Sequence, residues 1–145
     1  MPHTFDALDP DPAHLLGVIG VQVIDPDGNP NRVLQTNLGW QIKVDWNISG
    51  LVAGGLDGDW KVRAFAESLG GGFEGQVGAD MIVPLSAAPA TNNRSYSATI
   101  NVPAGTPPEG TYLLTVVVNY SNLGVPQQMA GFAQGPTVEF YNPGP

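Results

Sequence analysis

Apolar and polar residues alternate with a period of two along much of the chain. The longest such run is 40–48, with apolar residues at Trp40, Ile42, Val44, Trp46 and Ile48. A second run lies at 112–120, with one side formed by Tyr112, Leu114, Val116, Val118 and Tyr120. Because the side chains of a strand point alternately to its two faces, both runs predict strands with one buried face.

Shorter runs predict further strands at 16–25, 60–69, 81–85, 95–102, 128–132 and 136–141. Turn-forming residues separate them, most densely in DPDGNP at 25–30 and in the glycine-rich segment 70–80. No run has the period of an amphipathic helix. Short strands divided by turn residues are typical of an all-β sandwich. We expect seven to eight strands and one long glycine-rich loop.

The composition agrees with one folded domain. The chain has 145 residues, which suffices for a single hydrophobic core. Its hydrophobic share of 42% is too high for a disordered chain, although Gly and Pro are abundant. We expect a flexible N-terminal arm at 1–14, a single sandwich domain at 15–141 and a C-terminal tail at 142–145.

Two short motifs resemble immunoglobulin and fibronectin type III domains. EGTYLLTVVV at 109–118 is similar to their penultimate strand, with Tyr112 in the place of the tyrosine corner and Leu114 in that of the immunoglobulin cysteine. VDWNISG at 44–50 resembles the second fibronectin type III strand, whose core tryptophan would be Trp46. The resemblance covers 16–141 and implies an immunoglobulin-like antiparallel β-sandwich, without identifying one family.

The net charge of −8, from 13 acidic and 5 basic residues, argues against binding to polyanions. Nucleic acids and anionic membrane surfaces would be repelled. No stretch approaches 18 consecutive apolar residues, so we expect no membrane insertion. The N-terminal residues lack the basic and apolar regions of a secretory signal. We therefore expect a cytoplasmic protein as encoded, with export by a signal-independent route left open.

The side chains that most enzymes use for catalysis are scarce. The chain has no cysteine, and its two histidines, His3 and His14, lie in the expected arm, where a base cannot be held against a substrate. Glu67 and Glu139 are expected on outward strand faces, with no sign that they flank one groove as in a glycosidase. We therefore expect no enzymatic activity.

Two pairs of aspartates are weak candidates for calcium ligands. Asp25 and Asp27 bracket a proline, and Asp57 and Asp59 bracket a glycine. Loop carboxylates of this kind can ligate calcium, but neither pair continues into a complete twelve-residue calcium loop. Because Asp and Gly also form turns without any metal, we favour the turn interpretation and expect no cofactor.

The outward face of one sheet is the most informative feature. In an immunoglobulin-like sandwich the third, penultimate and last strands share a sheet. The alternation places Phe65, Leu113, Val117 and Tyr141 on the outward face of that sheet, together with Arg63. Apolar residues on each of three strands indicate a contact surface. Contact with another chain and coverage by a segment of the same chain are equally open.

Three classes of function remain. We favour a non-enzymatic structural or protein-interaction module that binds a protein partner, with self-association into a larger assembly as one form of it. A carbohydrate-binding module is the first alternative, although all three tryptophans are expected on inward faces. A calcium-stabilised surface or adhesion-type domain is the second.

Overall fold

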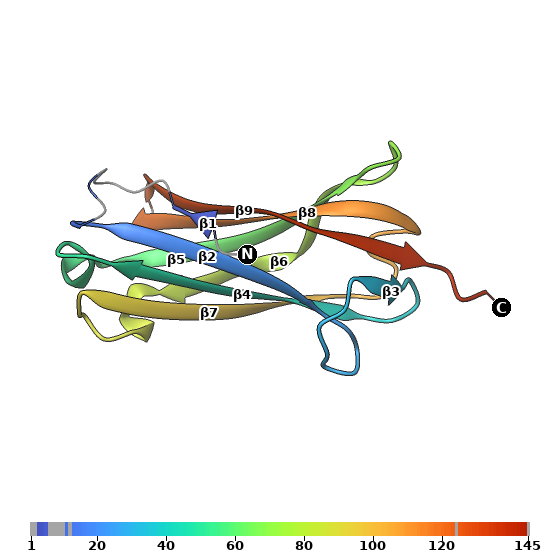
Figure 1. Ribbon diagram of the computed structural model, residues 1–145, viewed down its shortest axis with the longest axis horizontal. Helices are drawn as coiled ribbons and strands as arrows, with labels where there is room; N and C mark the ends of the chain where they lie inside the picture. Colours follow the sequence, from blue (N-terminus) through green and yellow to red (C-terminus); the bar gives the residue numbers. More distant parts are fainter. Residues whose placement is uncertain (1–2, 6–10, 12, 124, 145) are drawn as a thin grey trace.

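The computed structural model describes residues 3–5, 11, 13–123 and 125–144, which form a sandwich of two β-sheets (Figure 1). One sheet has the order β1 (His3–Thr4), β2 (Leu16–Ile24), β4 (Trp40–Ser49) and β7 (Asn93–Val102). The other has the order β3 (Val33–Gln35), β9 (Val125–Tyr141), β8 (Gly110–Asn122), β5 (Asp59–Ser68) and β6 (Glu74–Pro84). Neighbouring strands are antiparallel except β3 and β9. The all-β sandwich fold is confirmed.

Nine strands form where seven to eight are expected, because two very short strands, β1 and β3, are added at sheet edges. Single turns of 3-10 helix, η1 (Ala53–Gly55) and η2 (Leu85–Ala87), precede β5 and β7. The segments predicted as separate strands at 128–132 and 136–141 form one strand, β9, whose ladder with β8 continues across two irregularities. The glycine-rich segment is a loop only before Glu74, where β6 begins.

Aromatic side chains fill the space between the two sheets. Trp40, Trp46 and Trp60 are all buried, as the alternation predicts. The Trp46 ring stacks on Tyr96 with centroids 5.7 Å apart, and Trp60 meets Trp46 edge-on at 6.1 Å. Each such ring pair contributes about 0.5–1.5 kcal/mol beyond the area that it buries. These aromatic contacts join β4 and β7 of one sheet to β5 of the other.

The hydrogen bond of a tyrosine corner is present at the start of β8. The Tyr112 hydroxyl donates to the carbonyl oxygen of Pro108 at 2.8 Å, four residues upstream. Burial raises the pKa of the Tyr112 phenol, because the charged form would lose its hydration. Leu114, in the cysteine position of the resemblance, is buried. This end of β8 is thus tied to the loop that precedes it.

The described residues of the N-terminal segment lie on the sandwich, in the part of the chain where we expect a flexible arm at 1–14 from the sequence. His3 and Thr4 pair with β2, and the Phe5 side chain is only 8% exposed. Its ring lies over Gly17 of β2 and Gly131 of β9, where any Cβ would overlap it, and contacts Trp60 edge-on at 5.8 Å. Phe5 therefore closes one side of the sandwich. Residues 1–2, 6–10 and 12 of the predicted arm lie outside the described residues.

A buried arginine at the start of β7 holds two loops in place. The Arg94 guanidinium, 3% exposed, donates hydrogen bonds to the carbonyl oxygens of Ala53, Leu56, Leu85 and Ala88, at 2.6–3.2 Å. A buried charge is tolerated only when hydrogen bonds replace its hydration, and these four carbonyls supply them. Arg94 thereby connects the η1 and η2 turns to β7.

Candidate interaction surface

The outer face of the five-stranded sheet gathers apolar side chains from four adjacent strands. Arg63, Val117 and Phe132 are register partners across β5, β8 and β9, and the next row contains Phe65, Thr115 and Gln134. On β6, Ile82 pairs with Lys61 and so points to the same side. We call this surface the apolar outer face, and its members are Phe65, Ile82, Leu113, Val117, Phe132 and Tyr141.

The residues that the sequence places on this face all lie on it. Phe65, Arg63, Leu113 and Val117 are half-buried by their neighbours in the sheet, and Tyr141 is 39% exposed. Two members were missed: Ile82 is 57% exposed and Phe132 is 52% exposed. Alternation alone could not have found Ile82, because its neighbours Met81 and Val83 are also apolar and its side is set by pairing with Lys61 of β5. The role of the face as an interface stays a prediction.

Charges of both signs surround the apolar outer face. Arg63 lies over the Phe65 ring, with 6.0 Å between its Cζ and the ring centroid. Lys61 Nζ is 3.5 Å from Asp80 Oδ2 on β6. The pKa of the Asp80 carboxyl is lowered, first by a hydrogen bond from the Gln76 amide and then by Lys61. Glu67 and Glu139 add exposed negative charge. The face therefore offers partners for acidic and basic groups alike.

The two aspartate pairs lie at opposite ends of the sandwich, after β2 and at the start of β5 (Figure 1). Asp25 Oδ1 accepts hydrogen bonds from the backbone N–H groups of Asp27 and Asn29, at 3.0 and 2.9 Å. The hydrogen bond from Asn29 is the largest cause of the lowered pKa of Asp25. Asp57 Oδ1 accepts from Gly58 N–H at 2.9 Å. Asp25 and Asp57 therefore each accept hydrogen bonds from backbone N–H groups of their own loop, which is the usual role of aspartate in a turn.

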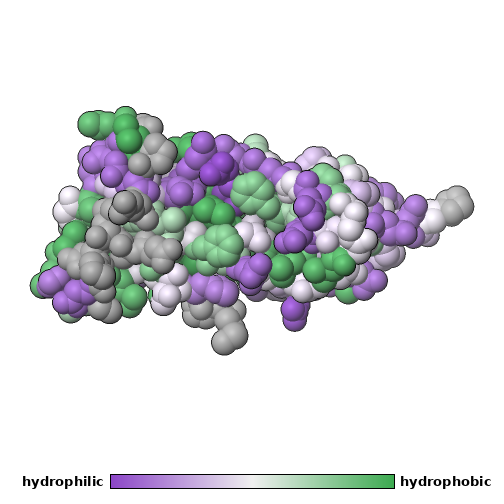
Figure 2. Space-filling view, turned by 90° about the horizontal axis from the view of Figure 1, so that it is seen from above, coloured by the Kyte–Doolittle hydropathy of each residue, from purple (hydrophilic) through white to green (hydrophobic). Residues whose placement is uncertain are grey.

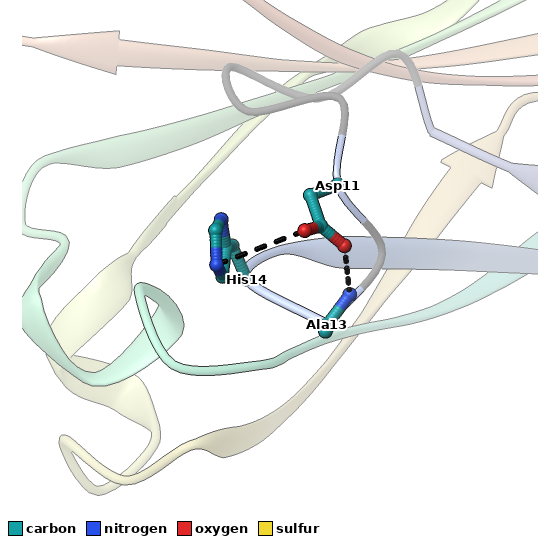
Figure 3. Close-up of polar contacts among 3 residues, drawn as sticks. All are labelled: Asp11, Ala13 and His14. Atoms are coloured by element: carbon teal, nitrogen blue, oxygen red, sulfur yellow. Dashed lines mark hydrogen bonds and ion pairs between the residues drawn. The ribbon is translucent and has the colours of Figure 1, made fainter.

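The structure does not bring His3 and His14 together with carboxylates into a metal site. His14 Nε2 is 3.7 Å from Asp11 Oδ2, whose other oxygen accepts from Ala13 N–H (Figure 3). Among the described residues, no three His, Cys, Asp or Glu side chains form a group that could hold a metal ion. Glu67 and Glu139 lie on strands separated by β8. Among the described residues, neither the two histidines nor these two glutamates form an acid–base pair across a groove.

A cavity of about 770 Å³ lies between the edges of β2 and β9, on the side that is uppermost in Figure 1. Figure 2, which views this side, shows hydrophobic patches along its middle among hydrophilic areas. The described lining residues are His3, Val21, Gln22, Val23, Pro30, Asn31, Arg32, Ala133, Gln134, Gly135 and Pro136. This lining supplies hydrogen-bond donors but no carboxylate, thiol or hydroxyl side chain.

Comparisons with known proteins describe the fold alone. No protein-family model matches the sequence, and no curated protein matches it. Among solved structures, a putative beta-galactosidase from Bacteroides fragilis matches with 15% identity, a TM-score of 0.45 and coverage of 79% of this chain and 15% of that chain. A glycosyl hydrolase family 2 member from Bacteroides cellulosilyticus DSM 14838 matches with 13% identity, a TM-score of 0.48 and coverage of 79% and 14%. The chain thus spans about a seventh of these proteins.

A third solved structure is similar over most of its length. The CARDB domain of the PF1109 protein from Pyrococcus furiosus, in complex with di-metal ions, matches with 17% identity and a TM-score of 0.43, covering 84% of this chain and 91% of that chain. In the described part of the chain, no helix has the length and apolar character required to cross a membrane.

Proposed function

We propose that this protein is a non-enzymatic interaction module that self-associates through the apolar outer face. The observation that carries the proposal is the row of exposed or half-buried apolar side chains on four adjacent strands. A strand requires apolar residues only on its inward side, so outward ones are not explained by folding. Exposed apolar patches rimmed by polar groups are typical of protein contact sites.

The local charges around the apolar outer face favour a second copy of the chain as the partner, although its net charge does not. The chain carries a net charge of −8, so two acidic surfaces would repel each other. The apolar outer face, however, presents Lys61 and Arg63 along β5 and the carboxylates of Glu67, Asp80 and Glu139 around them. Two such faces related by a two-fold axis can place basic groups of one copy against acidic groups of the other.

The test is the absolute mass in solution, measured by light scattering over a dilution series. The unmodified protein should form a defined oligomer whose mass falls on dilution. Phe65→Lys and Val117→Glu should each raise the dissociation constant at least about tenfold, since each places a charge in the desolvated contact. Lys43→Glu, an exposed change on β4 in the other sheet, is the control and should leave association unchanged.

A monomer at every concentration would reject self-association. If Lys43→Glu weakened association as much as Val117→Glu, the contact would lie elsewhere. Circular dichroism should show that all three variants remain folded. Intrinsic tryptophan fluorescence, measured with and without polysaccharides, addresses the carbohydrate alternative: because the tryptophans are buried, no response is expected. A melting temperature unchanged by millimolar calcium would argue against the calcium alternative.

A further inference from the structure

The open edges of the two sheets are protected to very different degrees. On β6, the ladder with β5 has a bulge, and Pro84 ends the strand. The ladder of β9 has two irregularities, and β3 pairs with its last residues. On β2, the short strand β1 and the Phe5 ring cover part of the edge. Bulges, prolines and covering segments are the devices that keep sheet edges from pairing with other chains.

The β7 edge has neither a bulge nor a proline, and β6 packs beside one end of it. All ten of its residues pair one-to-one with β4, from Asn93 opposite Ser49 to Val102 opposite Trp40, without a register shift. The strand contains no proline or glycine. Its outward side chains are all exposed and uncharged: Asn93, Ser95, Ser97, Thr99 and Asn101. Its one charged residue, Arg94, points inward and is held by backbone carbonyls.

The middle of this edge is free of partners within the described part of the chain. β4 is the only described strand that pairs with β7, which forms the lower border of the sandwich in Figure 1. At one end, Gly78 of β6 packs against Ile100 and Asn101. At the other, the Thr91 hydroxyl donates to the carbonyl oxygen of Asn93 at 2.8 Å. The open part therefore runs from Ser95 to Thr99.

We propose that this edge pairs with the β7 edge of a second copy, antiparallel about a two-fold axis at Ser97. Ser97 then lies opposite Ser97 of the partner copy, and Ser95 lies opposite Thr99. The two four-stranded sheets become one continuous sheet. This contact is distinct from the apolar outer face, so a protein that uses both surfaces makes two separate two-fold contacts.

Charge and symmetry identify the occupant as a second copy. Two antiparallel copies of one edge match each other's backbone donors and acceptors, and such a two-fold contact is self-complementary. The paired side chains are Ser, Thr and Asn, so no like charges meet even though each chain carries a net charge of −8. Hydroxyl side chains opposite one another also form hydrogen bonds across strands.

Cysteine cross-linking tests the register directly, because the chain has no cysteine of its own. Across an antiparallel two-fold axis the two Cα atoms are about 4.5–5.5 Å apart, a separation that a disulfide spans. Under mild oxidation, Ser97→Cys should give a disulfide-linked dimer. Thr99→Cys on the same strand is the matched control: its two copies would be about 13 Å apart and should not cross-link. Equal cross-linking at both positions, or none at Ser97→Cys, overturns the proposal.

A second pair of variants measures the contact without a disulfide. Ser97→Lys places two positive charges at the axis and should raise the dissociation constant of the edge contact at least about tenfold, with the melting temperature unchanged within a few degrees. Asn29→Lys, in the exposed turn after β2, makes the same charge change away from the edge and should have no effect. An effect of Asn29→Lys as large as that of Ser97→Lys contradicts the proposal.

The double variant Ser97→Cys with Val117→Glu separates the edge from the apolar outer face. If the two contacts are independent, the disulfide-linked dimer still forms while association through the face is lost. Loss of the cross-link in this double variant, with the fold retained, overturns the edge as a contact in its own right. A cross-link without any effect of Val117→Glu on mass would instead reject the face contact and leave the edge contact standing.

Discussion

The outer faces of the two sheets are built from the same kind of strand but differ in character. On β4 and β7 the outward residues are polar, and they bond to each other across the strands: Gln41 Nε2 donates to Asn101 Oδ1 at 2.7 Å, and Asn47 Nδ2 donates to Ser95 Oγ at 2.9 Å. On β5, β8 and β9 the corresponding outward positions include Phe65, Leu113, Val117, Phe132 and Tyr141.

The comparison separates what folding requires from what remains available for contact. Both sheets bury an apolar inner face, and that burial suffices to hold β4 and β7 in place although their outer face is polar. The apolar residues on the outward sides of β5, β8 and β9 are therefore not required for the fold. The buried core lies on the inner faces of the two sheets, which leaves the outer faces open to other roles.

The largest expected effect distinguishes the two faces of a single strand. Val116 of β8 is fully buried and Val117, its neighbour, lies on the apolar outer face. Val116→Asp should lower the free energy of unfolding by roughly 3–5 kcal/mol, because it buries a carboxylate without a partner. Val117→Asp should cost about 1 kcal/mol or less. Urea denaturation of the two variants measures the difference, and similar losses would contradict the assignment of the faces.

An intermediate effect compares two arginines. Arg94 donates to four buried or partly buried carbonyls, whereas Arg63 is half-buried on the apolar outer face, over Phe65. Arg94→Met should destabilise the fold by about 2–4 kcal/mol, because it leaves carbonyl groups without a donor. Arg63→Met should cost under about 1 kcal/mol, the loss of a cation–π contact at the surface of the sheet. Equal melting temperatures for the two variants would show that water replaces the Arg94 guanidinium.

The smallest effect is a loss of stability at alkaline pH from phenols on the inner faces. Burial raises the pKa of Tyr96, Tyr112 and Tyr120 above the usual value of about 10. The stability linked to a raised pKa is fully present below the unfolded-state pKa and is lost as pH rises through the folded-state pKa. The free energy of unfolding should therefore be level from pH 7 to about 9 and fall above about 10. Tyr112→Phe should lessen the fall, and an unchanged slope would exclude Tyr112 as a cause.

Much of the fold follows from local pattern. Predicted strands at 40–48 and 112–120 match β4 and β8 within two residues at each end, since each buries one full side whatever its neighbours are. The start of β6 was not predictable in this way. Glycine and charged residues between 74 and 80 show no alternation, and they become strand because β5 supplies a hydrogen-bonding partner.

The residues of the apolar outer face were likewise predictable only in part. Alternation alone identifies the outward side chains of β5 and β8. It does not show that Ile82 and Phe132 join them, because this depends on the registers of β6 and β9. Arg94 falls on the inward side of an alternating run, which marks it as unusual, but its four carbonyl partners come from turns that lie elsewhere in the chain.

The sequence by itself determined which side of β4, β5, β7 and β8 is buried, because the side-chain period of a strand is a local property of the backbone. Tertiary structure decided how the strands neighbour one another, and with that which edges are covered. Phe5 closes one side of the sandwich only because two glycines, at positions 17 and 131, are brought together beneath its ring. The β7 edge stays open because no described strand pairs with it beyond β4. Both outcomes depend on residues distant in the chain, which no local pattern encodes.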